Sequence, residues 1–415
     1  MMEYQASQRV SELFEKAIAI DEVAAGVQFI SDDHENTIKD QLELVVISAP
    51  TFFETERAKD VARRFTELGL EDVHIDEIGN AIGLLRGAGK GPAIMIEAHM
   101  DTVYPMETVI KPVVKDGFIY CPGIGDNTSG TAALLTIIRA FKNNNIILNG
   151  DIYFMGSVRE EGIGGFGGIQ FFMKGHPDIA AYVCIDGVQA GRITYQATGM
   201  TTCEANFYGI GGHASGAFAT MANALHAAGR AVAKIADTQV PLSPRTTFCV
   251  SNFHAGNDAS VHAIVPKATI KINMRSSQQF ALDELKAKVY QSIDEAAKEE
   301  TDRWGMDTIT YDIVEYFNVP AGSHDIHDPI CEATYLAMEH LGKSPTFNEG
   351  GATDAAYPIG AGIPAVCIGG GEINTHSHSA ANERFPMAET EKGPQAAFLV
   401  AILCSGIPEK LDSIL

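Results

Sequence analysis

Histidine and carboxylate side chains of this sequence stand where its apolar runs end. Those that stand out are His99, Asp101, Asp126, Glu160, Glu161, Asp186 and His378. All but one follow an apolar run, and Asp126 instead precedes a run with helical periodicity. In an open α/β sheet, loops leave from the carboxyl ends of the strands and helix N-termini point there. We therefore expect these side chains to meet at one edge of a sheet.

This many carboxylates at one edge would repel each other and lose hydration, on the order of several kcal/mol, unless a cation accompanied them. The two histidines together with three of these acidic residues would suit a pair of divalent ions of the zinc type, about 3.5–4 Å apart and sharing one carboxylate. Cobalt and manganese remain open, since ligand type alone does not select among these metals. Asp101 is expected to accept the proton of the second imidazole nitrogen of His99 and so to orient its ring.

The elements that must position these residues alternate between helices and strands. Continuous apolar runs predict buried strands at 93–98, 151–158, 180–186 and 363–371. Apolar residues at helical spacing predict helices at 7–20, 55–70 and 129–144. This alternation is typical of an α/β fold whose mainly parallel sheet is covered by helices on both faces.

The pattern changes between about Gly199 and Phe317, where half-exposed strands and two helical stretches predict a smaller α+β unit. A chain of 415 residues also exceeds the usual size of a single core. We expect a catalytic domain in two parts, residues 1–198 and 318–415, with a domain of residues 199–317 inserted between them.

Composition argues against several classes of partner. The formal net charge of -23 would repel nucleic acid and anionic lipid. The sequence has no run of 18 or more apolar residues, the length needed for a membrane-spanning helix. Seven scattered cysteines without a C-x-x-C pair favour a reducing compartment. The first residues lack the apolar core and cleavage site of a signal peptide, so we expect a cytoplasmic protein.

Eight motifs, in order along the chain, resemble the zinc exopeptidase and amidohydrolase family that includes carboxypeptidase G, peptidase T, aminoacylase and succinyl-diaminopimelate desuccinylase. The motifs are HMDTV, GIGDNTSGTAALL, REEG, CIDG, GGHAS, INMRSS, GGATDAA and HSHSAANE. The resemblance extends from about Ile47 to the C-terminus and is strongest to the peptidase T-like branch. It implies a zinc exopeptidase-like catalytic domain, an inserted lid and dimerisation domain, and a homodimer.

The resemblance also implies five metal ligands. His99 and Asp186 would hold one ion, Glu161 and His378 would hold the other, and Asp126 would bridge them. The tail carries two histidines, His376 and His378, where relatives show one. The spacing to the downstream acid Glu383 favours His378.

Glu160 matches the general base of the family. The implied reaction is hydrolysis of an amide bond in a small peptide, by a di- or tripeptidase or exopeptidase, through a hydroxide that bridges the two metal ions. An N-acyl amino acid amidohydrolase, of the aminoacylase or deacetylase type, is the alternative. The sequence does not separate aminopeptidase, carboxypeptidase and acylase specificity.

Other candidate residues lie outside the ligand set. His213 matches a histidine that, in dimeric members, reaches the partner subunit's active site and stabilises the oxyanion. Arg275 matches an arginine that often binds a substrate carboxylate. Thr353 and Asp354 either line the substrate pocket or organise a loop. His262 occupies a position where many relatives have asparagine, so contacts of the inserted domain with substrate are expected to differ.

A different class also has support in the sequence. Gly162, Gly164 and Gly167 spell G-x-G-x-x-G after an apolar run, with Asp186 at the end of the next one, as in a dinucleotide-binding oxidoreductase. However, Glu160 and Glu161 would aim negative charge at the pyrophosphate, where positive potential is needed. We therefore keep an NAD-binding oxidoreductase only as a distant alternative.

Overall fold

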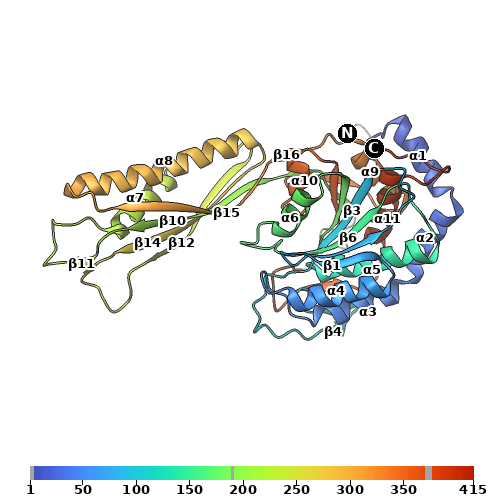
Figure 1. Cartoon of the computed structure of the whole chain (residues 1–415), viewed down its shortest axis with the longest axis horizontal. Helices are drawn as coiled ribbons and strands as arrows, with labels where there is room; N and C mark the ends of the chain where they lie inside the picture. Colours follow the sequence, from blue (N-terminus) through green and yellow to red (C-terminus); the bar gives the residue numbers. More distant parts are fainter. Residues whose placement is uncertain (1–3, 188–190, 370–375) are drawn as a thin grey trace. The chain divides into compact units, whose positions relative to one another are not determined.

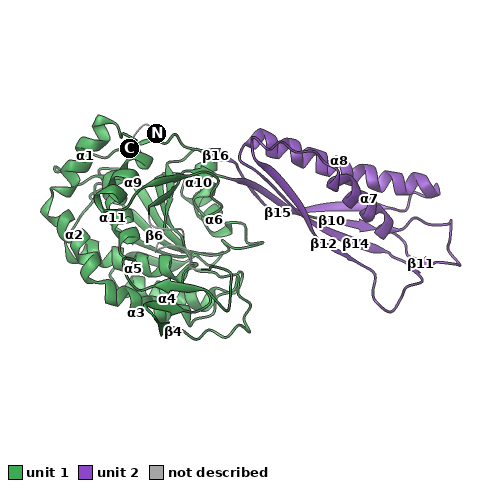
Figure 2. Ribbon diagram, turned by 180° about the vertical axis from the view of Figure 1, so that it is seen from behind, with its two compact units in different colours: residues 1–197, 323–415 green, residues 198–322 purple. Residues whose placement is uncertain are grey.

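The computed structural model describes residues 4–187, 191–369 and 376–415. The chain forms two compact units, and Figure 2 distinguishes them by colour. Unit 1 comprises Met1–Ala197 and Ser323–Leu415, and unit 2 comprises Thr198–Gly322. The expected boundary at 199 lies one residue from this division, and the one at 317 falls within the strand β15 (Thr310–Val319).

Unit 1 is built on an eight-stranded sheet. In spatial order its strands are β1 (Glu71–Ile75), β2 (Ala81–Leu85), β6 (Ile152–Ser157), β3 (Ala93–His99), β7 (Ile179–Ile185), β18 (Ala365–Ile368), β8 (Arg192–Thr194) and β17 (Thr346–Asn348). The four central strands β6, β3, β7 and β18 run parallel, which confirms the predicted sheet. The strand expected at 363–371 is observed as β18, and residues 370 and 371 lie outside the described residues.

Helices lie on both sides of this sheet (Figure 1). They are α1 (Gln8–Ile18), α2 (Asp21–Asp32), α3 (His34–Val45), α4 (Thr55–Glu67), α5 (Thr128–Asn143), α6 (Gly167–Gly175), α9 (Pro329–His340), α10 (Ala356–Gly360) and α11 (Lys392–Ser405). The helices α5 and α11 pack against β3 and β7, and α4 packs against β1 and β2. A small sheet of β4 (Val113–Lys115), β5 (Phe118–Tyr120) and β19 (Arg384–Pro386) completes the unit.

Strand β3 shows how the sheet positions the site. Successive side chains of a strand point to opposite faces, and both faces of β3 are buried. Ile94, Ile96 and Ala98 belong to the core that also contains residues of α5 and α11. Glu97 and His99 therefore share the other face, and this burial on both faces explains the continuously apolar run.

Unit 2 contains a four-stranded antiparallel sheet with its own core. The strand order is β12 (Thr246–Ala255), β14 (Lys267–Ser276), β10 (Gly199–Tyr208) and β15. The helices α7 (Ala224–Ala236) and α8 (Gln279–Trp304) contact this sheet. The strands β11 (Gly212–His213) and β13 (Ala263–Ile264) form a separate pair. The predicted lid and dimerisation role of this unit stays a prediction.

Two further short strands, β9 (Gln196–Ala197) and β16 (Gly322–Ser323), pair where the chain leaves and re-enters unit 1. Across the described ranges, no helix is long and apolar enough to cross a membrane.

Candidate metal centre

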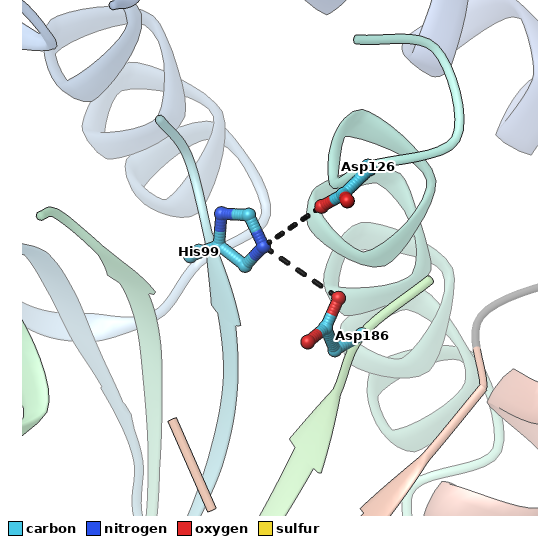
Figure 3. Close-up of side chains that lie close together, drawn as sticks. All are labelled: His99, Asp126 and Asp186. Atoms are coloured by element: carbon cyan, nitrogen blue, oxygen red, sulfur yellow. Dashed lines mark ion pairs between the residues drawn. The ribbon is translucent and has the colours of Figure 1, made fainter. Parts of the chain in front are cut away.

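The first group of candidate ligands combines His99, Asp126 and Asp186 (Figure 3). His99 ends β3, Asp186 follows the neighbouring parallel strand β7, and Asp126 precedes α5. The Nε2 atom of His99 lies 3.2 Å from Asp126 Oδ1 and 3.6 Å from Asp186 Oδ1. Because Nδ1 of the same ring donates to the backbone oxygen of Asp101 at 3.1 Å, the Nε2 lone pair of the neutral ring faces two carboxylates.

The second group combines Asp126, Glu161 and His378. Nε2 of His378 lies 3.2 Å from Glu161 Oε1 and 3.3 Å from Asp126 Oδ2. Asp126 thus presents one oxygen to His99 and the other to His378. In each group the potential ligand atoms lie within 4.8 Å of one another. Of the two tail histidines, His378 is the one in this group.

The charges of these groups fit a pair of divalent cations. A neutral imidazole whose lone pair faces two carboxylates needs a positive charge between them, and either a proton or a metal ion can supply it. Although burial opposes protonation, Glu160 and the aspartates raise the pKa of His99 well above its ordinary value. The hydrogen bond to Asp126 raises the pKa of His378 to about 9. Nitrogen and carboxylate donors in two groups that share Asp126 support two divalent metal ions.

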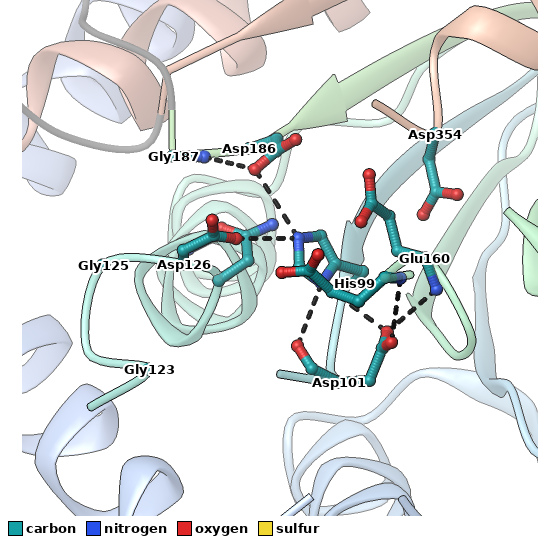
Figure 4. Close-up of polar contacts among 12 residues, drawn as sticks. His99, Asp101, Gly123, Gly125, Asp126, Glu160, Asp186, Gly187 and Asp354 are labelled. Carbon is teal, nitrogen blue, oxygen red and sulfur yellow. Dashed lines mark hydrogen bonds and ion pairs between the residues drawn. The ribbon is translucent and has the colours of Figure 1, made fainter. Parts of the chain in front are cut away.

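Glu160 lies next to this centre but in neither group of ligands found among the described residues. Its residue is 8% exposed, and Figure 4 shows its side chain beside His99 and Asp354. Burial raises the pKa of its carboxyl group well above the ordinary value. Burial likewise raises the pKa of Glu161 to about 7. Glu160 is therefore a buried carboxyl group with a raised affinity for a proton, next to both groups of ligands.

Asp101 accepts hydrogen bonds from the backbone of the two glutamates, and Figure 4 shows Asp101 with Glu160. Its Oδ1 and Oδ2 accept the N–H groups of Glu160 and Glu161, both at 3.0 Å, and Oδ2 also accepts the hydroxyl of Thr51 at 2.8 Å. The expected hydrogen bond to His99 differs in one respect. Oδ1 of the carboxylate is 3.6 Å from Nδ1, and the ring donates to the backbone oxygen of Asp101 at 3.1 Å.

Glu383 holds the loop that carries Asp126, a role that the sequence did not reveal. Its Oε1 accepts the N–H groups of Gly125 and Asp126 at 3.0 and 3.2 Å. Its Oε2 accepts the N–H group of Gly123 at 2.9 Å and the hydroxyl of Tyr104 at 2.5 Å. The residue is 2% exposed, so this carboxylate is a buried internal support of the loop.

Two buried carboxyl groups, those of Glu97 and Asp354, share the hydroxyl of Ser157. The Ser157 hydroxyl is 2.5 Å from Glu97 Oε1 and 2.7 Å from Asp354 Oδ2. A hydroxyl has one proton to donate, so at least one of the two carboxyl groups must itself be protonated. Burial raises the pKa of both. The acid within the apolar run Ala93–Ala98 was the available sequence signal for this pair.

Thr353 and Asp354 are themselves buried, at 6% and 2% exposed. Asp354 contacts Ser157 and lies beside Glu160 (Figure 4). A role of either residue in binding substrate stays a prediction.

The candidate residues of the inserted domain lie in unit 2. Ser215 Oγ is 3.0 Å from Nδ1 of His213, and the ring of His262 lies 5.1 Å from that of His213. Arg275, in β14, donates to Asn273 at 2.9 Å. The side chains of His213 and Arg275 are exposed. Their roles at the metal centre stay predictions.

Fold and site together define a metal-dependent hydrolase of peptide or amide bonds. Residues 95–403 match peptidase family M20/M25/M40, and the chain belongs to this family. This confirms the resemblance seen in the motifs. Membership of a peptidase family also contradicts the alternative of an NAD-binding oxidoreductase. Gly162 and Gly164 lie between the glutamates and α6, and Gly167 is the first residue of that helix.

Two relatives illustrate what the chain is similar to. The chain is 26% identical over 384 residues to the uncharacterised protein YqjE of Bacillus subtilis, covering 89% of this chain and 98% of that one. It is 28% identical over 272 residues to a succinyl-diaminopimelate desuccinylase of Nitrosospira multiformis, covering 60% and 70%.

Solved structures are similar as well. Aminopeptidase PepT from Bacillus cereus is 26% identical, with a TM-score of 0.69 over 88% of this chain and 97% of that chain. A tripeptidase from Staphylococcus aureus, 23% identical, shares the fold with a TM-score of 0.70 over the same shares of the two chains.

Proposed function

We propose that this protein is a di- or tripeptidase or exopeptidase that uses two zinc ions, with Glu160 as general base. The position of Asp126 carries the proposal. Its two carboxylate oxygens face His99 and His378 separately, at 3.2 and 3.3 Å. Asp186 and Glu161 complete the two groups of ligands. The buried carboxyl group of Glu160 lies beside them without being a ligand in either group.

His99, Asp126 and Asp186 would hold one divalent ion and Asp126, Glu161 and His378 the other, and such ions would lower the pKa of a bound water and polarise the scissile carbonyl group. Glu160 then accepts the proton of the attacking water and passes it to the nitrogen of the leaving amine. The raised pKa of Glu160 favours this transfer, because it increases the affinity of the carboxylate for the proton of the attacking water. Asp101 keeps Glu160 and Glu161 in place through their backbone N–H groups.

The inserted domain would act on the substrate. We propose that His213 stabilises the oxyanion and that Arg275 binds a substrate carboxylate, as in the family the motifs resemble. Ser215 Oγ lies at Nδ1 of His213, which leaves Nε2 of the exposed ring for such a contact. Thr353 and Asp354 are proposed to line the substrate pocket.

A substrate screen on metal-replete protein tests the proposal, with bound metal quantified in the same sample. The panel contains dipeptides, tripeptides and N-acyl amino acids. We expect hydrolysis of peptides with about two zinc ions per chain, since two groups of ligands are present. Glu160→Ala and Glu160→Gln should keep both ions and lose at least about a hundredfold in kcat. Full activity of either variant would eliminate Glu160 as the base.

A second function is an N-acyl amino acid amidohydrolase. The similarity to a succinyl-diaminopimelate desuccinylase favours it, because that relative is named for removing an acyl group. The same panel decides between the two functions, since a preference for N-acyl amino acids over peptides would select the second.

We also propose a cytoplasmic homodimer. All seven cysteines are free, which supports a reducing compartment. Strand β12 is an edge of the unit 2 sheet, and an edge strand offers backbone groups for pairing with another chain. Light scattering coupled to size-exclusion chromatography measures the mass in solution, and a monomer at micromolar concentration would contradict the dimer.

A further inference from the structure

Four consecutive backbone N–H groups around Glu160 are each held by a side chain from a distant segment. The donors and acceptors are Val158 to Asn80 at 3.0 Å, Arg159 to Glu54 at 3.1 Å, Glu160 to Asp101 at 3.0 Å and Glu161 to Asp101 at 3.0 Å. This segment follows β6 and precedes α6. It therefore has no ladder of its own, and side-chain acceptors satisfy its buried donors.

The contact between Glu54 and Arg159 falls at a constrained point of this segment. Arg159 has a φ of 60°, a left-handed conformation that is uncommon for residues other than glycine. Such a conformation persists only where its surroundings enforce it. Because Glu160 is the next residue, the backbone conformation at Arg159 sets the direction in which the Glu160 side chain leaves the chain.

One oxygen atom of Glu54 accepts hydrogen bonds from two residues in the left-handed conformation, Arg159 and Phe52. This Oε1 atom accepts the N–H of Arg159 and also that of Phe52, at 2.9 Å. Phe52 has a φ of 72°, and the guanidinium of Arg159 lies over its ring, 5.2 Å from the centroid. The segments that contain Phe52 and Arg159 are therefore joined by both backbone and side-chain contacts.

Residues on both sides of Glu54 are held to the residues that directly follow β3. Glu54 directly precedes α4 and is 5% exposed. In the first turn of α4, the buried Arg57 donates to the backbone oxygens of Met100 at 2.7 Å and Ile47 at 2.6 Å. Nearby, Thr51 donates to Asp101 at 2.8 Å. Glu54 and Asp101, which both hold the segment of Glu160, are therefore connected to each other through these contacts of Arg57 and Thr51.

We propose that Glu54 is a positioning residue for Glu160. It acts through Arg159, whose backbone it fixes, and does not touch the reacting atoms. The inference rests on the proposed function, since it takes Glu160 as the base. Misplacing a catalytic group by about 1 Å can cost about a hundredfold in rate, so loss of this contact should be visible in kcat.

Substitutions of Glu54 can distinguish the effect of its acceptor oxygen from the effect of its negative charge. Both N–H groups donate to the same Oε1, so the single carbonyl oxygen of glutamine can accept both. Glu54→Gln should therefore preserve the contact without the charge. Glu54→Asp keeps the charge but withdraws the oxygen by one methylene, and Glu54→Ala removes the acceptor. Glu56→Ala is the matched control, because the Glu56 side chain is 71% exposed and pairs with Lys59 in the same helix.

The test measures kcat, KM, bound metal and amide hydrogen exchange on metal-replete, full-length protein, with the best peptide of the panel. In Glu54→Ala and Glu54→Asp, we expect kcat to fall about tenfold to a hundredfold, with KM within about threefold of wild type. Bound metal should stay at the wild-type level, because Asp101 still holds Glu161. Exchange should rise in peptides that contain Arg159. Glu54→Gln and Glu56→Ala should resemble wild type.

Wild-type kcat in Glu54→Ala would overturn the proposal. So would a Glu54→Gln enzyme slower than Glu54→Asp, since charge would then matter more than position. Loss of metal in parallel with activity would also overturn it. If the wild-type protein hydrolyses nothing in the panel, the proposed function fails by itself. Unchanged amide hydrogen exchange around Arg159 in Glu54→Ala and Glu54→Asp would then still overturn the positioning role of Glu54.

Discussion

The carboxylate of Glu383 accepts the backbone N–H group of Asp126 at 3.2 Å, although 257 residues separate the two in the chain. The same carboxylate accepts the N–H groups of Gly123 and Gly125. The backbone of the aspartate that faces both histidines of the metal centre is therefore fixed from the far end of the sequence.

Replacing Glu383 should weaken metal binding. In Glu383→Ala the loop of Asp126 loses three acceptor contacts, and we expect metal affinity to fall about tenfold to a hundredfold, as for other residues that orient ligands. Tyr104→Phe removes only the hydroxyl donor to Glu383 and should cost less. Competition with a chromophoric chelator measures both affinities. Wild-type affinity in Glu383→Ala would contradict this role.

The two tail histidines should differ in their effect on metal content. His378 lies in the second group of ligands, so His378→Asn should leave about one ion per chain. His376→Asn should keep about two, since a residue outside the ligand set does not complete the coordination of an ion. Asparagine suits both positions, which have φ values of 66° and 55°. Elemental analysis of the purified variants gives the counts, and the reverse pattern would assign the ligand to His376.

Metal affinity should depend on pH. Metal ligands must be deprotonated, and the pKa is about 7 for Glu161, raised by burial, and about 9 for His378, raised by Asp126. Affinity should therefore increase as pH rises from about 6 to about 9 and level off above that. Calorimetry in buffers of different ionisation enthalpy counts the protons released. A pH-independent affinity with no proton release would contradict these raised pKa values.

Gly130 allows α5 to begin close to β7. A Cβ atom there would lie 2.4 Å from Asn127 Oδ1 and 2.6 Å from the backbone oxygen of Ile185. Gly130→Ala should thus separate the segments of Asp126 and Asp186, lowering the free energy of unfolding by about 1–3 kcal/mol. Metal content should fall with it.

The matched control is Gly229→Ala in α7, where a Cβ would meet nothing within 4 Å. This change should raise the free energy of unfolding by about 0.5–1 kcal/mol, because alanine loses less backbone entropy in a helix. Urea denaturation of the metal-free proteins compares the two. Equal effects of both substitutions would show that the contact at Gly130 does not matter.

The sequence predicted the central strands and the set of residues gathered at their ends because both follow local rules. Apolar runs of strand length predict buried parallel strands, and residues just after them must lie at the same edge. The grouping of His99 with Asp186 follows directly from the pairing of β3 and β7. Residues such as Glu161 also carried the signal of a family motif.

The supports of the site could not be predicted in this way. Glu54 contacts Arg159, and Glu383 contacts Gly123, through backbone N–H groups, which every residue except proline has. No residue type or spacing marks such a contact. Asp101 shows the same limit: its position suggested a partner for His99, but nothing in the sequence indicated that its carboxylate also accepts the N–H groups of the two glutamates.

The order of the ligands along the chain has a consequence for biosynthesis. The first group is complete by Asp186, before unit 2 begins, whereas the second requires His378, which follows unit 2. A chain that emerges from the ribosome can therefore assemble only the first group of ligands until the residues after unit 2 have been made. A product truncated before His378 would carry a mononuclear centre at most, so the second ion would report that the segment after unit 2 has been made.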